Sequence, residues 1–175
     1  MIGGYSMKIM VPLVDGHLAD QYGSRAPRED QIAERPVRSF PVTFTAFPEA
    51  TQTFALTLVD YDSIPVCGFA WIHWTLANLP ATSPTLPEDA SRHLSSPIIQ
   101  GKNSNASGFV NAPAEICQGY TGPRPPHGKH DYLLTGYALD TALSLPQGYW
   151  MNELLHAMTG HVLDTTQIIL PYTAD

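Results

Sequence analysis

Residues 119–132, which read GYTGPRPPHGKHDY, decide the fold. Proline fixes φ at about −65° and glycine permits positive φ, so this alternation predicts a rigid loop that holds backbone amides and carbonyls in one arrangement. If residues 130–139 are extended, His130 and Tyr132 project from the same face, because strand side chains repeat every two residues. The stretch therefore predicts one wall of a small ligand site, and the alternative is an ordinary surface turn before a strand.

Length and composition favour one β-rich globular domain. Of 175 residues, 43% are hydrophobic and 14% charged, and the 16 prolines and 13 glycines are scattered along the chain. Scattered turn residues favour many short strands over a helical bundle. We expect residues 1–7 to form an N-terminal extension, with Met7 as an alternative start, and residues 8–175 to form the domain.

Charge and cysteine content narrow the classes of partner. Nine basic against 16 acidic residues give a formal net charge of −7, which disfavours nucleic-acid binding because that depends on dense cations. No secretory signal pattern is present and no run approaches the roughly 18 apolar residues of a membrane span, so we expect a cytoplasmic protein without membrane insertion. We expect Cys67 and Cys117 to be reduced core residues, with a disulfide between them as the alternative.

The order of elements is many strands followed by a helix near the C-terminus. The segments predicted as strands are 8–14, 40–46, 53–60, 69–79, 132–140 and 165–172. A turn at 48–51 joins the second and third of these, so we expect them to pair. Residues 149–158 repeat apolar side chains at helical spacing. Residues 15–39 are poorly periodic and are expected to be long loops around a further short strand. Residues 81–118 are also poorly periodic and are expected to be a long crossing segment, and long ordered loops tend to carry function.

Four polar residues lie where chemistry could use them. Asp60 ends one predicted strand, His73 lies on the next, and His130 and Tyr132 follow the Gly/Pro loop. Each alone is a weak indication, because a histidine on an apolar strand is usually a hydrogen-bonded core residue and a strand-end aspartate is usually a turn former. Their order along the chain is more informative than any one of them.

Two further stretches extend the pattern of residues 119–132. The chain reads DYDSIP at 60–65 and FAWIHWTLANLP at 69–80. With the Gly/Pro loop, these segments resemble the phosphatidylethanolamine-binding protein family, and most of all its bacterial, Raf kinase inhibitor-like branch. There the segments read approximately Asp-Pro-Asp-Ala-Pro, then Trp-X-His-Trp with an Asn-(Ile/Leu)-Pro end, then Gly-Tyr-X-Gly-Pro-X-Pro-Pro leading into His-X-Tyr. The resemblance covers roughly residues 8–172, and several ordered motifs make it specific.

The resemblance implies a mainly β fold with a central antiparallel sheet, a smaller second sheet and a helix near the C-terminus. It also implies a small surface pocket for anions such as phosphate groups, and a homodimer as in bacterial members. The matching pocket positions are Asp60, His73, His130 and Tyr132, with Pro125 and Pro126 shaping the rim. The supporting positions are Asp62, Trp74, Gly122 and Arg124. We expect no cofactor and no bound metal.

The chain departs from the family pattern at positions that bear on ligand choice. Tyr61 replaces the usual proline of the first motif, and Ser63 with Ile64 replaces a single alanine. Arg124 occupies a position that is cysteine in many bacterial members, and Asp131 stands where arginine is usual. Arg124 could contact a phosphate bidentately or face solvent, and we favour the solvent-facing side chain.

The function expected from this set is non-catalytic binding of a small anionic or phosphorylated ligand, or regulation through such binding. Imidazoles donate to phosphate oxygens, more strongly when protonated, and a nearby aspartate can fix the tautomer. The alternative is a hydrolase or metal-dependent enzyme that uses Asp60, His73 and His130. Against it, the chain lacks a Gly-x-Ser-x-Gly element and the spacings typical of histidine and glutamate metal ligands. A third hypothesis is a protein partner, which the name of the animal relatives implies but no motif here identifies.

Overall fold

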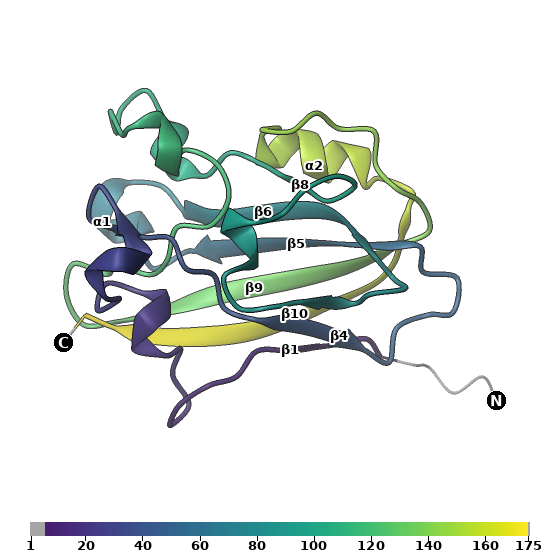
Figure 1. Ribbon diagram of the computed structural model, residues 1–175, viewed down its shortest axis with the longest axis horizontal. Helices are drawn as coiled ribbons and strands as arrows, with labels where there is room; N and C mark the ends of the chain where they lie inside the picture. The colour runs from purple at the N-terminus through teal and green to yellow at the C-terminus, as the bar shows by residue number, and fades with distance from the viewer. Residues whose placement is uncertain (1–5, 175) are drawn as a thin grey trace.

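An antiparallel five-stranded sheet runs through the middle of the molecule (Figure 1). The computed structural model describes residues 6–174. The strands lie in the order β10 (Val162–Thr173), β9 (Lys129–Leu139), β5 (Thr53–Asp60), β6 (Trp71–Pro80) and β8 (Ile99–Gln100). This confirms the predicted central antiparallel sheet.

Smaller sheets complete the β structure of the described residues. One has the order β1 (Lys8–Met10), β4 (Val42–Thr45) and β7 (Thr85–Leu86). The other is a hairpin of β2 (Gln31–Ile32) and β3 (Arg35–Pro36). The smaller second sheet that the sequence predicted is therefore present. The hairpin lies within residues 15–39, where we expected long loops around one short strand and the structure has two.

The predicted pairing of the strands at 40–46 and 53–60 is wrong. β4 pairs with β1 and β7, whereas β5 pairs with β6 and β9. The chain between them passes from one sheet to the other, and Phe44 of β4 stacks on Phe54 of β5 with ring centroids 4.4 Å apart. Alternation identifies the buried face of a strand but not its partner, so two strands that face each other across a core resemble a hairpin in sequence.

Apolar side chains cover both faces of the central sheet. Every residue of β5 is buried. Phe54 and Leu56 belong to the larger core, which β1 and β4 share, while Ala55 on the other face belongs to a smaller core completed by α2 (Met151–Ala157). Burial on both faces explains why this strand appears in the sequence as an almost continuous apolar run.

The helix near the C-terminus is α2, as predicted, although it begins two residues later than expected. The backbone N–H of Trp150 donates to Oε2 of Glu153 at 2.6 Å, which satisfies a donor at the helix start, and Leu154 is fully buried. The single turn α1 (Ile64–Cys67) follows β5 and has no buried residue. The 3₁₀ turns are η1 (Asp20–Tyr22), η2 (Arg28–Asp30), η3 (Ala90–Arg92), η4 (Ser104–Ala106) and η5 (Ala114–Ile116).

The structure also bears on what we expected of the N-terminal extension, the two cysteines and a membrane span. Residues 1–5 of the predicted extension lie outside the described residues, whereas Met7 is buried in the larger core. Cys67 and Cys117 are free, but Cys67 is exposed and Cys117 half-buried, so the expectation of core cysteines is wrong. Within residues 6–174, no helix is long and apolar enough to cross a membrane.

Candidate functional site

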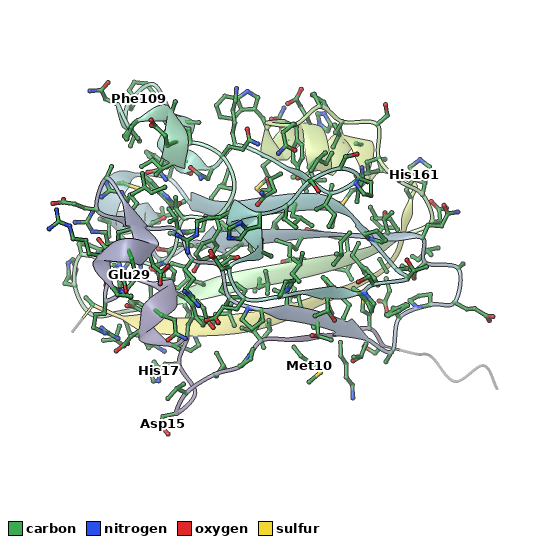
Figure 2. The ribbon with its side chains drawn as sticks, viewed as in Figure 1. Met10, Asp15, His17, Glu29, Phe109 and His161 are labelled. Carbon is green, nitrogen blue, oxygen red and sulfur yellow. The ribbon has the colours of Figure 1, made fainter. Side chains whose placement is uncertain are left out.

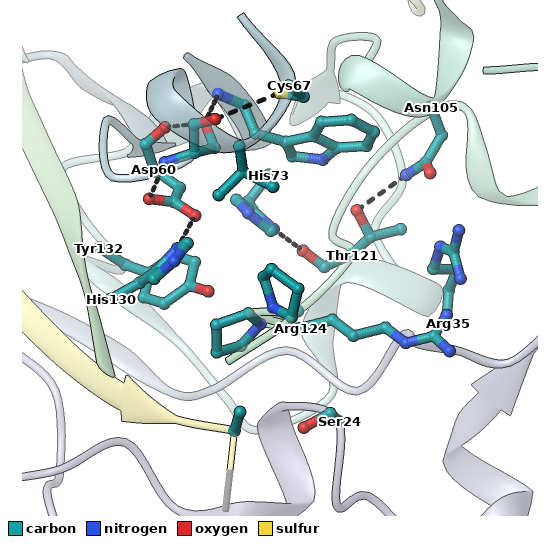
Figure 3. Close-up of a pocket in the computed structure, with 17 residues that line it drawn as sticks. Ser24, Arg35, Asp60, Cys67, His73, Asn105, Thr121, Arg124, His130 and Tyr132 are labelled. Atoms are coloured by element: carbon teal, nitrogen blue, oxygen red, sulfur yellow. Dashed lines mark hydrogen bonds and ion pairs between the residues drawn. The ribbon is translucent and has the colours of Figure 1, made fainter. Parts of the chain in front are cut away.

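A cleft of about 620 Å³ lies at one end of the central sheet, beside α1 (Figure 3). Asp60 is the last residue of β5, Trp71 the first of β6, and His130 the second of β9. Antiparallel pairing therefore brings all three to the same end of the sheet. The Gly/Pro loop and Arg35 of β3 also line the cleft. Its volume is in the range of small-molecule sites, roughly 300–1,000 Å³.

A buried hydrogen-bonded pair of side chains joins β5 to β9 in this cleft. Nδ1 of His130 lies 2.7 Å from Oδ2 of Asp60, and the two residues are only 7% and 3% exposed. The other carboxylate oxygen accepts from the Ser63 backbone N–H at 3.1 Å. Because a carboxylate oxygen only accepts, the His130 proton is on Nδ1. Nε2 is therefore the nitrogen of His130 that a ligand can use.

His73 is positioned by an irregularity in the sheet. The register of β5 against β6 shifts between Leu58 and Val59, which leaves His73 as the extra residue of a β-bulge. Its Nδ1 donates to the Thr121 carbonyl at 2.7 Å, and its own carbonyl accepts from the Thr121 N–H at 3.0 Å. These two bonds attach the Gly/Pro loop to the central sheet.

The protonation state of His73 decides what it offers to a ligand. Burial lowers the pKa of His73 to about 4, against opposing effects of the Thr121 carbonyl and the Asp60 charge. At neutral pH the ring is neutral and its single N–H is already bound by Thr121, so Nε2 is an acceptor. The expectation that a neutral imidazole donates to a phosphate oxygen is therefore wrong for His73, which must first take up a proton.

Tyr132 completes the floor of the cleft. It lies on the same face of β9 as His130, as the spacing of two residues predicts, and both line the cleft. Its ring packs edge-on against His73 with centroids 5.1 Å apart. Burial raises the pKa of the Tyr132 hydroxyl well above its ordinary value, so the group is a neutral phenol.

The Gly/Pro loop forms the rim. Pro125 is buried and Pro126 exposed, and both line the cleft. The Gly122 N–H donates to the Pro36 carbonyl of β3 at 2.9 Å. A side chain at Gly122 would clash, because a Cβ there would lie 1.9 Å from the Tyr22 carbonyl oxygen. Glycine is thus required by close packing at this position, and its φ is not positive.

Two arginines line the cleft on the side across from Asp60 and His130 (Figure 3). Arg124 belongs to the Gly/Pro loop and is exposed, and Arg35 belongs to β3 and is half-buried. The sequence favoured an Arg124 side chain that faces solvent. Arg124 is exposed and at the same time belongs to the lining of the cleft.

Asp62, Trp74 and Asp131 lie outside the cleft lining. Oδ2 of Asp62 accepts from the Asp131 N–H at 2.8 Å, and the Asp131 side chain pairs with Lys129 at 3.0 Å. Trp74 is fully buried in the larger core, where its indole N–H donates to Gln100 at 2.8 Å. The two supporting residues Asp62 and Trp74 therefore hold the surrounding strands, and Asp131 takes no part in the cleft.

Sequence reasoning missed part of the lining. Ser63 and Trp71 lie inside the quoted motifs, which is a signal that could have found them. Arg35 and Asn105 lie in segments taken as irregular, and no local pattern marks them. The other lining residues that were not predicted are Ser24, Val66, Cys67, Thr121 and Ala174.

The arrangement does not suit a metal. Within residues 6–174, no group of three or more His, Cys, Asp or Glu side chains is placed to hold a metal ion. Asp60 and His130 face each other, and Nδ1 of His73 faces a carbonyl. The metal-dependent alternative that used these three residues therefore has no support in the geometry.

Comparison with known proteins agrees with the fold. Residues 15–173 match the family described as phosphatidylethanolamine-binding protein. The chain belongs to the phosphatidylethanolamine-binding protein family. This confirms the resemblance on which the sequence analysis relied.

Bacterial members of the phosphatidylethanolamine-binding protein family are similar to this chain over most of its length. The Bacillus subtilis protein YxkA is 46% identical over 156 residues, which are 88% of this chain and 92% of YxkA. A crystal structure of a family homologue from Chlamydia trachomatis has a TM-score of 0.76 and 25% identity, and covers 98% of this chain and 100% of that one. Escherichia coli YbcL, described as a new member of the mammalian family, has a TM-score of 0.75 at 24% identity and covers 97% and 99% of the two chains, which supports the fold.

Proposed function

We propose that the cleft binds a small anionic ligand, such as a phosphate group or a phosphorylated small molecule, without chemical conversion. The observation that carries the proposal is the buried Asp60–His130 pair, which faces a cleft also lined by two arginines. Hydrogen bonds from cationic donors to phosphate are about twice as strong as those between neutral groups. The cleft thus offers donors of the kind that an anion prefers.

The charge balance inside the cleft supports an anionic ligand. Asp60 is the one carboxylate among the lining residues that the structure describes, and both of its oxygens accept hydrogen bonds from protein groups. A positive charge on His130 would be costly to bury alone, and Asp60 offsets that cost. A bound anion would add a second partner at Nε2.

The hydrogen bonds of nearby hydroxyl and thiol groups support binding without catalysis. Ser63 Oγ has one proton, which the Asp60 carbonyl at 2.7 Å or the Phe69 carbonyl at 2.9 Å can accept, and Oγ accepts from the Trp71 N–H. Within residues 6–174, no hydrogen bond joins a histidine ring to a serine, threonine or cysteine side chain. An activated nucleophile normally has a base within hydrogen-bond reach.

NMR titration with inorganic phosphate tests the proposal. We expect the imidazole signals of His73 and His130 to shift at millimolar phosphate, and His130→Ala to weaken binding roughly tenfold or more, as loss of a hydrogen bond to a charged group predicts. His130→Asn is a second variant that retains a donor toward Asp60 but removes Nε2. Unperturbed imidazole signals in the native protein would contradict the proposal.

His161→Ala is the matched control. His161 also pairs with an aspartate, since its Nδ1 lies 2.8 Å from Oδ1 of Asp140, but this pair is exposed. It lies at the end of the molecule away from α1 (Figure 2). We expect phosphate affinity to be unchanged in this variant. If circular dichroism shows that His130→Ala and His130→Asn are unfolded while His161→Ala is folded, His130 is a core residue and not a ligand group.

A further inference from the structure

We propose that Arg35 and Arg124 form a second anion subsite in the same cleft. The preferred ligand would then be a phosphorylated small molecule that carries a second anionic group, either a carboxylate or another phosphate. This inference rests on the proposed function, because it assigns the first phosphate to the histidine side of the cleft. It goes further than a pocket for one phosphate, because it specifies ligands with two anionic groups.

Arg35 and Arg124 differ from half of the arginines in the chain because, within the described residues, they form no ion pair with a carboxylate. Arg25, Arg38 and Arg92 form ion pairs with carboxylates at 2.5–3.2 Å. The remaining three of the six arginines in the chain are Arg28, Arg35 and Arg124, and within the described residues none of these has an ion pair. In a chain with a net charge of −7, two of the three guanidinium groups without an ion pair line one cleft.

A backbone hydrogen bond brings Arg35 close to the Gly/Pro loop, which itself carries Arg124. Gly122 donates to Pro36, the neighbour of Arg35, at 2.9 Å, so β3 is attached to the Gly/Pro loop two residues before Arg124. Arg35 itself follows a two-residue hairpin turn in which Ala33 and Glu34 both have positive φ. Such turns hold the hairpin ends rigidly, which fixes the origin of the Arg35 side chain.

Among the described lining residues, no carboxylate pairs with these guanidinium groups. Asp60 is bound by His130 and Ser63, and Figure 3 shows it across the cleft from Arg35 and Arg124. A guanidinium presents a planar fork of donors that matches a carboxylate or phosphate bidentately. An anion on this side of the cleft could therefore pair with two guanidinium groups that have no carboxylate partner among the described residues.

The two sides of the cleft differ in what they accept. At neutral pH, Nε2 of His73 is an acceptor, so the histidine side suits a group that still carries a proton, such as a phosphate monoanion. The arginine side offers only donors and suits a fully ionised group. A ligand with two anionic groups satisfies both sides at once, whereas a lone phosphate leaves one side unpaired.

Isothermal titration calorimetry with matched ligand pairs tests the second subsite. The first pair is 3-phosphoglycerate and glycerol 3-phosphate, which differ by a carboxylate in place of a hydroxymethyl group. The second is fructose 1,6-bisphosphate and fructose 6-phosphate, which differ by one phosphate. We expect the ligand with two anionic groups to bind about tenfold more tightly in at least one pair, as one charge-assisted contact at a partly exposed site predicts.

Arginine variants assign that preference to residues. We expect the Arg35→Ala/Arg124→Ala double variant to lose the tenfold preference, so that the two ligands of each pair bind with similar affinity. Arg124→Lys should lose part of the preference, because an ammonium cannot pair bidentately. Arg28→Ala removes the same charge from an exposed arginine outside the cleft and should keep the preference.

The outcomes separate this inference from the proposed function. If glycerol 3-phosphate shifts the His73 and His130 signals but neither ligand pair shows a preference, the second subsite is wrong and the anion pocket stands. The second subsite is also wrong if a preference survives in the double variant or disappears equally in Arg28→Ala. If none of the four ligands shifts either imidazole signal, both proposals are wrong.

Discussion

His73 and His130 both line the cleft, yet they are held in different ways. Nδ1 of His73 donates to a backbone carbonyl, while Nδ1 of His130 donates to the carboxylate of Asp60. Burial lowers the pKa of His73. The two side chains therefore differ in the group that fixes the ring: a carbonyl of the Gly/Pro loop for His73 and a carboxylate of β5 for His130.

The lowered pKa of His73 predicts how stability depends on pH. The folded-state pKa is about 4 and the ordinary value is 6.5, so the unfolded chain takes up this proton first as the pH falls. The contribution of neutral His73 to the free energy of unfolding is fully present above about pH 6.5 and decreases as the pH falls toward 4. The decrease is on the order of 3 kcal/mol, at about 1.4 kcal/mol per pKa unit. Urea unfolding at pH 7 and pH 4 measures the loss.

His73→Gln provides the comparison, because it keeps an amide donor but cannot titrate. We expect its stability to fall less between pH 7 and pH 4 than that of the native protein. The carboxylates that also titrate in this range are common to both proteins and cancel in the difference. Equal losses in the two proteins would show that His73 does not contribute.

The residues of the cleft differ in how far the sequence could predict them. Asp60, His73, His130 and Tyr132 are marked by ordered motifs, and the structure brings all four into one cleft. Arg35 has no such signal, because the turn before it is Ala33-Glu34, which lacks the glycine or asparagine usual at positive φ. Its place beside the site depends on a hydrogen bond between segments far apart in the chain, which no local pattern records.

At the scale of elements, the Gly/Pro loop is the part of the site that its sequence describes best. Thr121 bonds to His73 of β6 and Gly122 bonds to Pro36 of β3, so the loop is anchored on two sides. The Tyr22 carbonyl lies where a side chain of Gly122 would be. The loop carries Arg124 and both rim prolines, so a shift of its backbone moves the whole rim.

Gly122→Ala should therefore affect both stability and binding. The new Cβ would lie 1.9 Å from a backbone oxygen, which cannot move aside as a flexible side chain could. We expect a loss of about 1–3 kcal/mol in the free energy of unfolding, typical of overpacked sites, together with weaker phosphate binding. Urea denaturation and the imidazole titration measure the two effects.

Gly108→Ala is the control for this substitution. Gly108 lacks positive φ, and a Cβ there meets nothing within 4 Å. We expect its stability to change by at most about 0.5 kcal/mol and its phosphate affinity to stay the same. Native stability and native affinity in Gly122→Ala would mean that the loop is not held as tightly as its contacts imply.

Strand positions could be predicted from the sequence, but strand partners could not. The segments at 53–60 and 132–140 nearly coincide with β5 and β9, because buried apolar runs bounded by turns are a local property. β4 and β5 are consecutive and yet lie in different sheets. Which strands pair depends on contacts between distant segments, such as β5 with β9, and these leave no periodicity in the sequence.

At the scale of the whole molecule, the central sheet separates two cores and supports the cleft at one end. The larger core packs the second sheet on one face, and α2 with its smaller core covers the other. The fold could be predicted because several motifs occur in the order and spacing of one family, which composition alone would not have shown. The homodimer and the cytoplasmic location remain predictions.

Packing between the two sheets should determine stability without determining ligand binding. Phe44 of the second sheet is 1% exposed and stacks on Phe54, and Gly136 of β9 leaves room for its ring. Phe44→Ala should lower the free energy of unfolding by about 3–5 kcal/mol through lost burial and the cavity left behind. Phe44 lies outside the cleft lining, so the folded protein should keep its phosphate affinity.

Phe109→Ala makes the same chemical change at a side chain that is 97% exposed and projects from the surface between η4 and η5 (Figure 2). We expect its stability to change by at most about 0.5 kcal/mol, because little apolar area is removed from contact. Urea unfolding of both variants, with phosphate titration under conditions where each is folded, separates the effects. Equal stability losses would contradict the role of sheet packing. Loss of phosphate affinity in folded Phe44→Ala would mean that the cleft depends on packing near the other end of β5 as well as on its own contacts.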